Sequence, residues 1–152
     1  MRPWLPILLG LALTVSCRRP PVEETFVKVA DRDGQNRYCF PVALDDPAVT
    51  YDLDILIGMD CTDLVFSRFI RMPLRIQWTD PSGRPYEETV WVGRDQLEGS
   101  TYYQKNLWLE YRHGMRPVET GTWELALFLP EDQTKTFNVT GTGIRLQRNG
   151  TR

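Results

Sequence analysis

The chain has 152 residues, with 18 basic and 20 acidic side chains and a formal net charge of −2 at pH 7. It contains no basic stripe, which argues against nucleic acid as a partner. Aromatic residues make up 11% of the sequence, so the chain is expected to fold rather than to be disordered. Beyond residue 16 it is long enough for one domain with its own core.

The N-terminus has the pattern of a secretory signal that ends at a lipid-modified cysteine. Arg2 gives a basic start, and the uncharged apolar run Trp4 to Val15 is shorter than the roughly 20 residues that a membrane-spanning helix needs. The stretch "LTVSC" at 13–17 resembles the lipobox of bacterial lipoproteins. That resemblance implies cleavage before Cys17 and attachment of lipid at its thiol and new amine. Several acyl chains together give stable membrane anchoring.

The residues that follow Cys17 support the lipoprotein interpretation. "RRPPVEETF" is charged and contains two prolines, so it is predicted to be a tether that holds a domain off a membrane. Ordinary secretion is the alternative, because Thr14 and Ser16 also satisfy a small-x-small cleavage site. We expect a signal over 1–16, a tether over 17–24, a domain over 25–148 and a tail over 149–152.

Apolar and polar residues alternate with period two along the predicted domain. Segments 24–30, 37–44 and 51–57 alternate first, and in the last of them Leu53, Ile55 and Ile57 face one way. Such segments are typical of half-buried strands. The segment 64–70 is apolar and rich in branched and aromatic residues, which predicts a further strand.

The clearest element is a β-hairpin predicted over 73–92. Its two halves alternate, and "DPSG" at 80–83 has Pro and Gly where a turn prefers them. A polar connection over 93–105 is predicted as a loop or a single helical turn, and alternating segments follow at 106–112, 121–129 and 142–148. Since no helical period persists for ten residues, we predict an all-β chain. Its fold would be a single antiparallel β-sandwich, Ig-like or jelly-roll-like, of about eight strands.

Cys39 and Cys61 are the two cysteines that remain once Cys17 is assigned to lipid. An even pair in an oxidising compartment allows a Cys39–Cys61 disulfide. Two separate buried thiols are an equally weighted alternative. A metal site built on this pair would need more ligands, and His113 is the only histidine.

Residues that could carry catalysis are sparse. His113 lies in the expected loop "YRHGMRP", where a solvated turn residue is commoner than a catalytic base. Six aspartates crowd residues 45–63 and could bind Ca²⁺, but the EF-hand spacing is absent and Asp is common in turns. We therefore expect no catalytic residue, no metal and no cofactor.

The aromatic residues pose a choice between core packing and a sugar-binding surface. Trp78 and Trp123 are in phase with the apolar residues of their strands and are expected in the core. The phase is less decisive for Trp91 and Trp108, and Tyr102 and Tyr103 lie in the polar connection. These last four, Trp91, Trp108, Tyr102 and Tyr103, are the candidates for stacking on a carbohydrate or other ligand. Core packing is the favoured role for the tryptophans.

Four stretches of the sequence carry a family resemblance. They are "YDLDILI" (51–57), the hairpin 73–92 with Glu88-Thr89, "GTWELALFLPED" (121–132) and "VTGTGIRLQR" (139–148). In that order they resemble the GldH family of gliding-motility lipoproteins of Bacteroidetes. The resemblance implies a small β-sandwich lipoprotein on the periplasmic side of the envelope, needed for gliding and its linked secretion. It carries over no catalytic residue.

These observations lead to two expectations about function. The first is a non-enzymatic lipoprotein anchored through Cys17 in the outer membrane, facing the periplasm, that binds envelope proteins. The second is a lipoprotein that binds carbohydrate or another ligand with exposed aromatics. An apolar patch or an unpaired sheet edge would favour the first, and coplanar exposed aromatics would favour the second.

Overall fold

A computed structural model describes residues 21–150, which form nine strands and a few single-turn helices. The strands are β1 (Val22–Lys28), β2 (Tyr38–Leu44), β3 (Thr50–Asp60), β4 (Arg71–Thr79), β5 (Pro85–Gly93), β6 (Leu97–Ser100), β7 (Gln104–Met115), β8 (Gly121–Phe128) and β9 (Val139–Asn149). The helical turns are η1 (Val29–Asp31), α1 (Asp63–Phe66), η2 (Arg94–Gln96) and α2 (Glu131–Thr136). None of the helices in this part of the chain has the length and apolar character needed to cross a bilayer.

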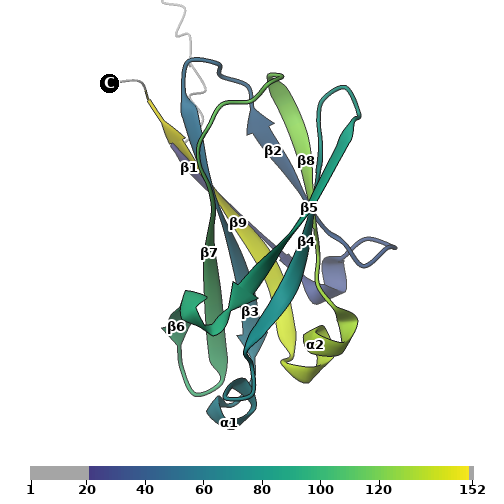
Figure 1. The fold of residues 1–152 in the computed structure, drawn as a ribbon, viewed down its shortest axis with the longest axis vertical. Coiled ribbons are helices and arrows are strands. Elements are labelled where there is room, and N and C mark those ends of the chain that lie inside the picture. Colours follow the sequence, from purple (N-terminus) through teal and green to yellow (C-terminus); the bar gives the residue numbers. More distant parts are fainter. Residues whose placement is uncertain (1–20, 151–152) are drawn as a thin grey trace, which may run out of the picture.

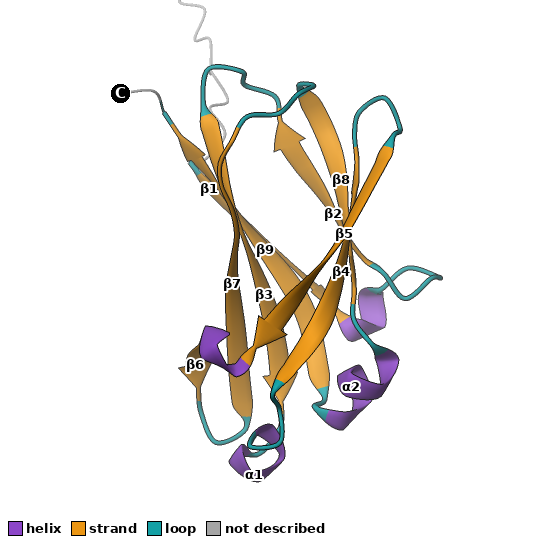
Figure 2. Ribbon diagram, viewed as in Figure 1, coloured by secondary structure: helices purple, strands orange, loops and turns teal. Residues whose placement is uncertain are grey.

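The strands form two antiparallel sheets that face each other as a sandwich (Figures 1 and 2). Sheet A has the order β1-β9-β3-β7-β6, and sheet B has the order β2-β8-β4-β5. The predicted fold class is therefore confirmed, with nine strands in place of about eight. Within residues 21–150, the edge strands are β1 and β6 in sheet A and β2 and β5 in sheet B, and each of them pairs on one side only.

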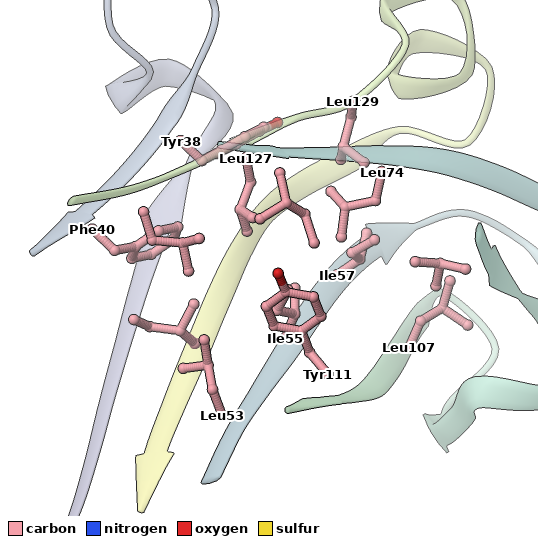
Figure 3. Close-up of a cluster of buried hydrophobic side chains, with 14 of the residues drawn as sticks. Tyr38, Phe40, Leu53, Ile55, Ile57, Leu74, Leu107, Tyr111, Leu127 and Leu129 are labelled. Carbon is pink, nitrogen blue, oxygen red and sulfur yellow. The ribbon is translucent and has the colours of Figure 1, made fainter. Parts of the chain in front are cut away.

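The core fills the space between the two sheets (Figure 3). Leu53, Ile55 and Ile57 on β3 all point into it, as their alternation predicts. Sheet B contributes alternate residues in the same way, among them Phe40 and Leu74. Full burial of one such side chain contributes about 1.5–3 kcal/mol to stability, so these alternate inward-facing residues hold the two sheets together.

The predicted hairpin is formed by β4 and β5. Its turn closes with a hydrogen bond from the Gly83 amide to the Asp80 carbonyl, 2.9 Å long. Gly83 has φ +88°, a left-handed conformation that favours glycine. The Asp80 carboxylate accepts from the backbone amide (2.8 Å) and Nε (2.9 Å) of Arg84. Burial alone would raise the pKa of Asp80, but these hydrogen bonds outweigh it and the pKa is lowered.

The strand predicted over 64–70 is wrong, because α1 and a loop occupy this segment. Thr62 caps the helix, with its side-chain oxygen accepting from the Val65 amide at 3.3 Å. Phe66 and Phe69 are buried while Ile70 is 77% exposed. The apolar residues therefore follow a helical spacing of three, which keeps both rings on the core.

Two further boundaries differ from the prediction. β1 begins at Val22 and so takes in the last residues of the segment 17–24 expected as a tether. Val22 to Lys28 pair with β9, and an ion pair of 2.7 Å joins Glu24 to Arg145. In the polar connection over 93–105, the helical turn η2 confirms one of the two expected forms, but the short strand β6 was not expected.

Candidate functional site

A groove of about 630 Å³ lies between the two sheets at the upper end of the sandwich in Figure 1, where β2, β4 and β7 end and β5 and β8 begin. Its walls are largely apolar and come from both sheets and from the loop between β7 and β8: Leu44, Trp78, Tyr86, Met115, Pro117, Val118 and Trp123. The volume is within the roughly 300–1,000 Å³ of sites that hold small ligands. The groove is the candidate functional site.

Three aromatic rings build the sheet B side of the groove. The Trp78 and Trp123 rings meet edge to face, with centroids 6.1 Å apart and an interplanar angle of 84°. Tyr86 lies 6.2 Å from Trp123 at 33°. Edge-to-face aromatic pairs are favourable beyond the area they bury. Trp123 Nε1 also donates to the Glu119 carbonyl at 2.9 Å, which ties the β7–β8 loop to the same wall.

A chain of polar contacts crosses from sheet B to sheet A beside these rings. Trp78 Nε1 donates to the Tyr111 hydroxyl at 3.1 Å, and that hydroxyl donates to the Glu88 carboxylate. Arg112 Nη2 pairs with Glu88 Oε1 at 2.6 Å. Burial raises the pKa of Tyr111 to about 12, and the hydrogen bond to Glu88 adds to this effect while the bond from Trp78 opposes it. At neutral pH the hydroxyl therefore stays a donor, and the network fixes the groove floor.

The charges around the groove are paired with one exception. Glu87 lies 3.7 Å from Arg75, Glu88 pairs with Arg112, and Glu119 lies 3.9 Å from Arg84. Arg116 is exposed and lines the groove, and it makes no ion pair with any residue in 21–150. The groove thus combines apolar walls with one positive charge that is open to an incoming group.

The structure does not bring the four predicted stacking residues together. Trp91 is 53% exposed on the outer face of sheet B, where the Arg71 guanidinium lies 4.5 Å above its ring. Trp108 is on the outer face of sheet A, paired with Leu56 on β3 and covered by Arg145 at 4.3 Å. Tyr102 and Tyr103 lie between β6 and β7 with their rings perpendicular. These residues form no coplanar platform, and the core packing favoured for the tryptophans is wrong for Trp91 and Trp108.

The two cysteines lie in different parts of the fold and are free thiols. Cys39 lies between the inward-facing Tyr38 and Phe40 of β2 and points to the outer face, 3.7 Å from Asp33. Cys61 is in the core just after β3, at the opposite end from the groove. The disulfide that the sequence allowed is absent. The alternative of two buried thiols holds for Cys61, whereas Cys39 is only half-buried. Burial raises the pKa of both thiols. Cys17 lies outside the described residues.

The residues considered for catalysis or metal binding are not gathered into a site. His113 was expected in a loop, but it is an exposed residue of β7, with Nε2 3.5 Å from Glu110 and Nδ1 3.7 Å from Asp52. Across residues 21–150, no three His, Cys, Asp or Glu side chains are placed to hold a metal ion. Asp52 accepts a hydrogen bond from the Gly114 amide at 2.7 Å, so it supports the β7 backbone.

Sequence reasoning missed most of the groove. Trp78 and Trp123 were expected in the core, and Trp123 is there, only 8% exposed, while both also wall the groove. Tyr86, Arg112 and Met115 were not singled out. One signal was present: Glu88 has the same phase as the inward-facing Val90 and Val92 of β5. A carboxylate at an inward position needs a polar partner, and here the partners are Tyr111 and Arg112.

Comparisons with known proteins add no function. No protein-family model matches the chain, and no curated protein matches it. The chain is similar to a crystal structure of a protein from Sulfurospirillum deleyianum, at 9% sequence identity and a TM-score of 0.38. That match covers 86% of this chain and 99% of the other. A likeness at this TM-score carries no argument about function.

Proposed function

We propose that this chain is a non-enzymatic lipoprotein of the bacterial cell envelope that acts as a protein-interaction or assembly component. The groove between the sheets carries this proposal. It offers apolar and aromatic walls and a fixed hydrogen-bonded floor, and no three metal-ligating side chains are grouped among residues 21–150. Largely apolar walls with a few fixed polar groups suit the binding of a partner segment or ligand.

The cellular setting of the proposal comes from the sequence. The lipobox-like stretch that ends at Cys17 supports a lipid anchor, and the favoured position is the outer membrane, facing the periplasm. The resemblance to the GldH family suggests the gliding-motility and linked secretion machinery as the assembly that the protein serves. Envelope proteins would then be its partners.

Binding of a small ligand is the second candidate function. The three rings of Trp78, Tyr86 and Trp123 beside the Glu88–Arg112 pair favour it, because aromatic faces and fixed polar groups together recognise sugars and similar molecules. The groove is a better place for such a ligand than the separated residues Trp91 and Trp108.

The test is mass spectrometry of the protein purified from its native envelope in mild detergent, with the co-purified proteins identified in the same run. The proposal expects diacylglycerol on an N-terminal Cys17 and enrichment of other envelope proteins. Val118→Glu should reduce that enrichment, since Val118 lines the groove and is 86% exposed. Ile70→Glu is the matched control, because Ile70 is 77% exposed at the other end of the sandwich.

The outcomes separate the candidates. An unacylated product with no enriched partner would overturn the assembly proposal and leave ligand binding in its place. Equal loss of partners in both glutamate variants would show that the groove is not the docking surface.

A further inference from the structure

The edge of sheet B beside the groove is open. β5 pairs with β4 and, within residues 21–150, with no other strand. On the facing sheet, β7 lies opposite β5, and β6 extends one strand further. β5 is therefore an edge strand of sheet B within the described residues.

The backbone groups that point away from β4 can be assigned from two hydrogen bonds. The Asp80 amide donates to the Arg84 carbonyl at 3.0 Å, and the Arg94 amide donates to the Ile70 carbonyl at 3.1 Å. The two bonds lie at the two ends of the β4–β5 pairing and belong to one antiparallel register, in which Ile76 pairs with Glu88. Since hydrogen-bonded pairs recur at every second residue, even-numbered residues of β5 bond to β4. The odd-numbered residues Glu87, Thr89 and Trp91 turn their amides and carbonyls outward.

Pro85 agrees with this assignment. Proline has no amide to donate, and in sheets it is found where the missing amide would face solvent at an edge. As an odd-numbered residue of β5, Pro85 stands on the outward side. The free edge thus offers three amides and the matching carbonyls to an extended backbone, which is the requirement for adding a strand.

The groove lies directly beside this edge. Tyr86 and Glu88 are inward-facing residues of β5, and both line the groove. Because side chains of a strand alternate between faces, every second side chain of a strand added along Glu87 to Trp91 would point toward the groove. Large apolar side chains suit its walls.

The unpaired charge of Arg116 predicts the charge of one residue of the added strand. Glu87 and Glu88 already have arginine partners, so they attract a basic side chain of the added strand only weakly. Arg116 has no acidic partner among the described residues and also lines the groove. An acidic side chain on the incoming segment would complete the pairing.

We propose that β5 accepts an extended segment of a partner protein as a fifth strand of sheet B. Large apolar residues at alternate positions of that segment fill the groove, and an acidic residue pairs with Arg116. This mode of binding rests on the proposed function, because it specifies how the assembly component holds its partner.

The experiment selects binding peptides from a displayed library of random 12-residue sequences, with the purified full chain in mild detergent as the target. Affinity of the most frequently selected peptide is then measured by fluorescence anisotropy. Thr89→Pro removes one outward amide without removing a bond to β4, and Thr89→Val is the matched control that keeps the amide. We expect Thr89→Pro to weaken binding about tenfold or more, since one lost hydrogen bond and a displaced backbone act together, and Thr89→Val to have little effect.

A second measurement leaves the protein unchanged. The selected peptide is methylated at one backbone amide at a time, and methylation at alternate positions only should abolish binding, because only alternate amides of an added strand face β5. Arg116→Gln should weaken binding of a peptide that contains an acidic residue and leave its Glu-to-Gln analogue unaffected.

Each result decides the matter. Alternate-position sensitivity together with loss in Thr89→Pro supports strand addition. Equal binding to Thr89→Pro and Thr89→Val, uniform effects of methylation, or a library that yields no binder overturns it. If strand addition fails while envelope proteins still co-purify and are lost in Val118→Glu, the proposed function stands and only the mode of binding is wrong.

Discussion

Lys105 offers the sharpest test of how the lower end of the sandwich is held. It lies on β7 with its side chain 1% exposed, although it carries a charge. Its Nζ donates to the carbonyls of Thr101 and Tyr102, the latter at 3.1 Å, and pairs with Asp63 Oδ1 at 2.9 Å. One buried ammonium therefore joins β7 to the β6–β7 loop and to α1.

The cost of removing this ammonium can be worked from its partners. Lys105→Met keeps a side chain of similar length but leaves the two carbonyls without their donor. Each lost hydrogen bond to a charged group costs about 1.5–3 kcal/mol, so the two together cost about 3–6 kcal/mol. Part of this cost is offset because a buried charge no longer has to be desolvated. The pair with Asp63 adds little, since Asp63 is 63% exposed and exposed pairs contribute about 0–1 kcal/mol. We expect a net loss of about 2–3 kcal/mol.

The assay is urea unfolding of the full chain, with the free energy of unfolding obtained from the midpoint and slope. Asp63→Asn is the control and should lose no more than about 1 kcal/mol. If Lys105→Met retains wild-type stability within about 0.5 kcal/mol, or if Asp63→Asn is equally damaging, the reasoning about the two carbonyls is refuted.

Two further predictions concern the packing of β9 and the groove floor. Gly141→Ala should cost several kcal/mol by the same assay, because its Cβ would stand 2.3 Å from the Val27 carbonyl oxygen. Gly34→Ala is the control and should cost much less, because nothing lies within 4 Å of its Cβ. Equal losses in the two variants would contradict this reasoning. Tyr111 has its folded-state pKa raised to about 12, so its contribution to stability is full below about pH 10 and is lost as the pH rises toward 12. Unfolding midpoints from pH 9 to 12 should therefore fall more steeply in the wild type than in Tyr111→Phe, and parallel curves would count against the raised pKa.

The sandwich could be predicted because period two is a local property. Leu53, Ile55 and Ile57 can be placed on one face of a strand without knowing which strands pair with it. A sheet with one buried face is enough to define a layer of the fold. The same reasoning failed at Phe66 and Phe69, because a short apolar run fits a strand or a helical turn equally. There the N-cap at Thr62 was the deciding residue.

The groove could not be predicted in the same way, because its residues meet only through tertiary structure. Glu88 and Tyr111 are on strands of different sheets, and only the facing of the two sheets brings them into contact. Phase left the exposure of Trp91 and Trp108 undecided. It could not say that they lie on opposite outer faces of the sandwich, which is decided by the sheet that each strand joins.

The start of β1 and the groove lie at the same end of the sandwich. Val22 at the start of β1 pairs with Gln147, Tyr51 pairs with both Arg148 and Met115, and Met115 lines the groove. From Cys17 to Val22 the chain can reach at most about 18 Å, even when fully extended. A lipid on Cys17 would therefore hold the groove and the free edge of β5 near the membrane surface. The segment that β5 accepts should then come from a partner that is itself at the membrane, because a strand distant from the bilayer could not reach this edge without a long linker of its own.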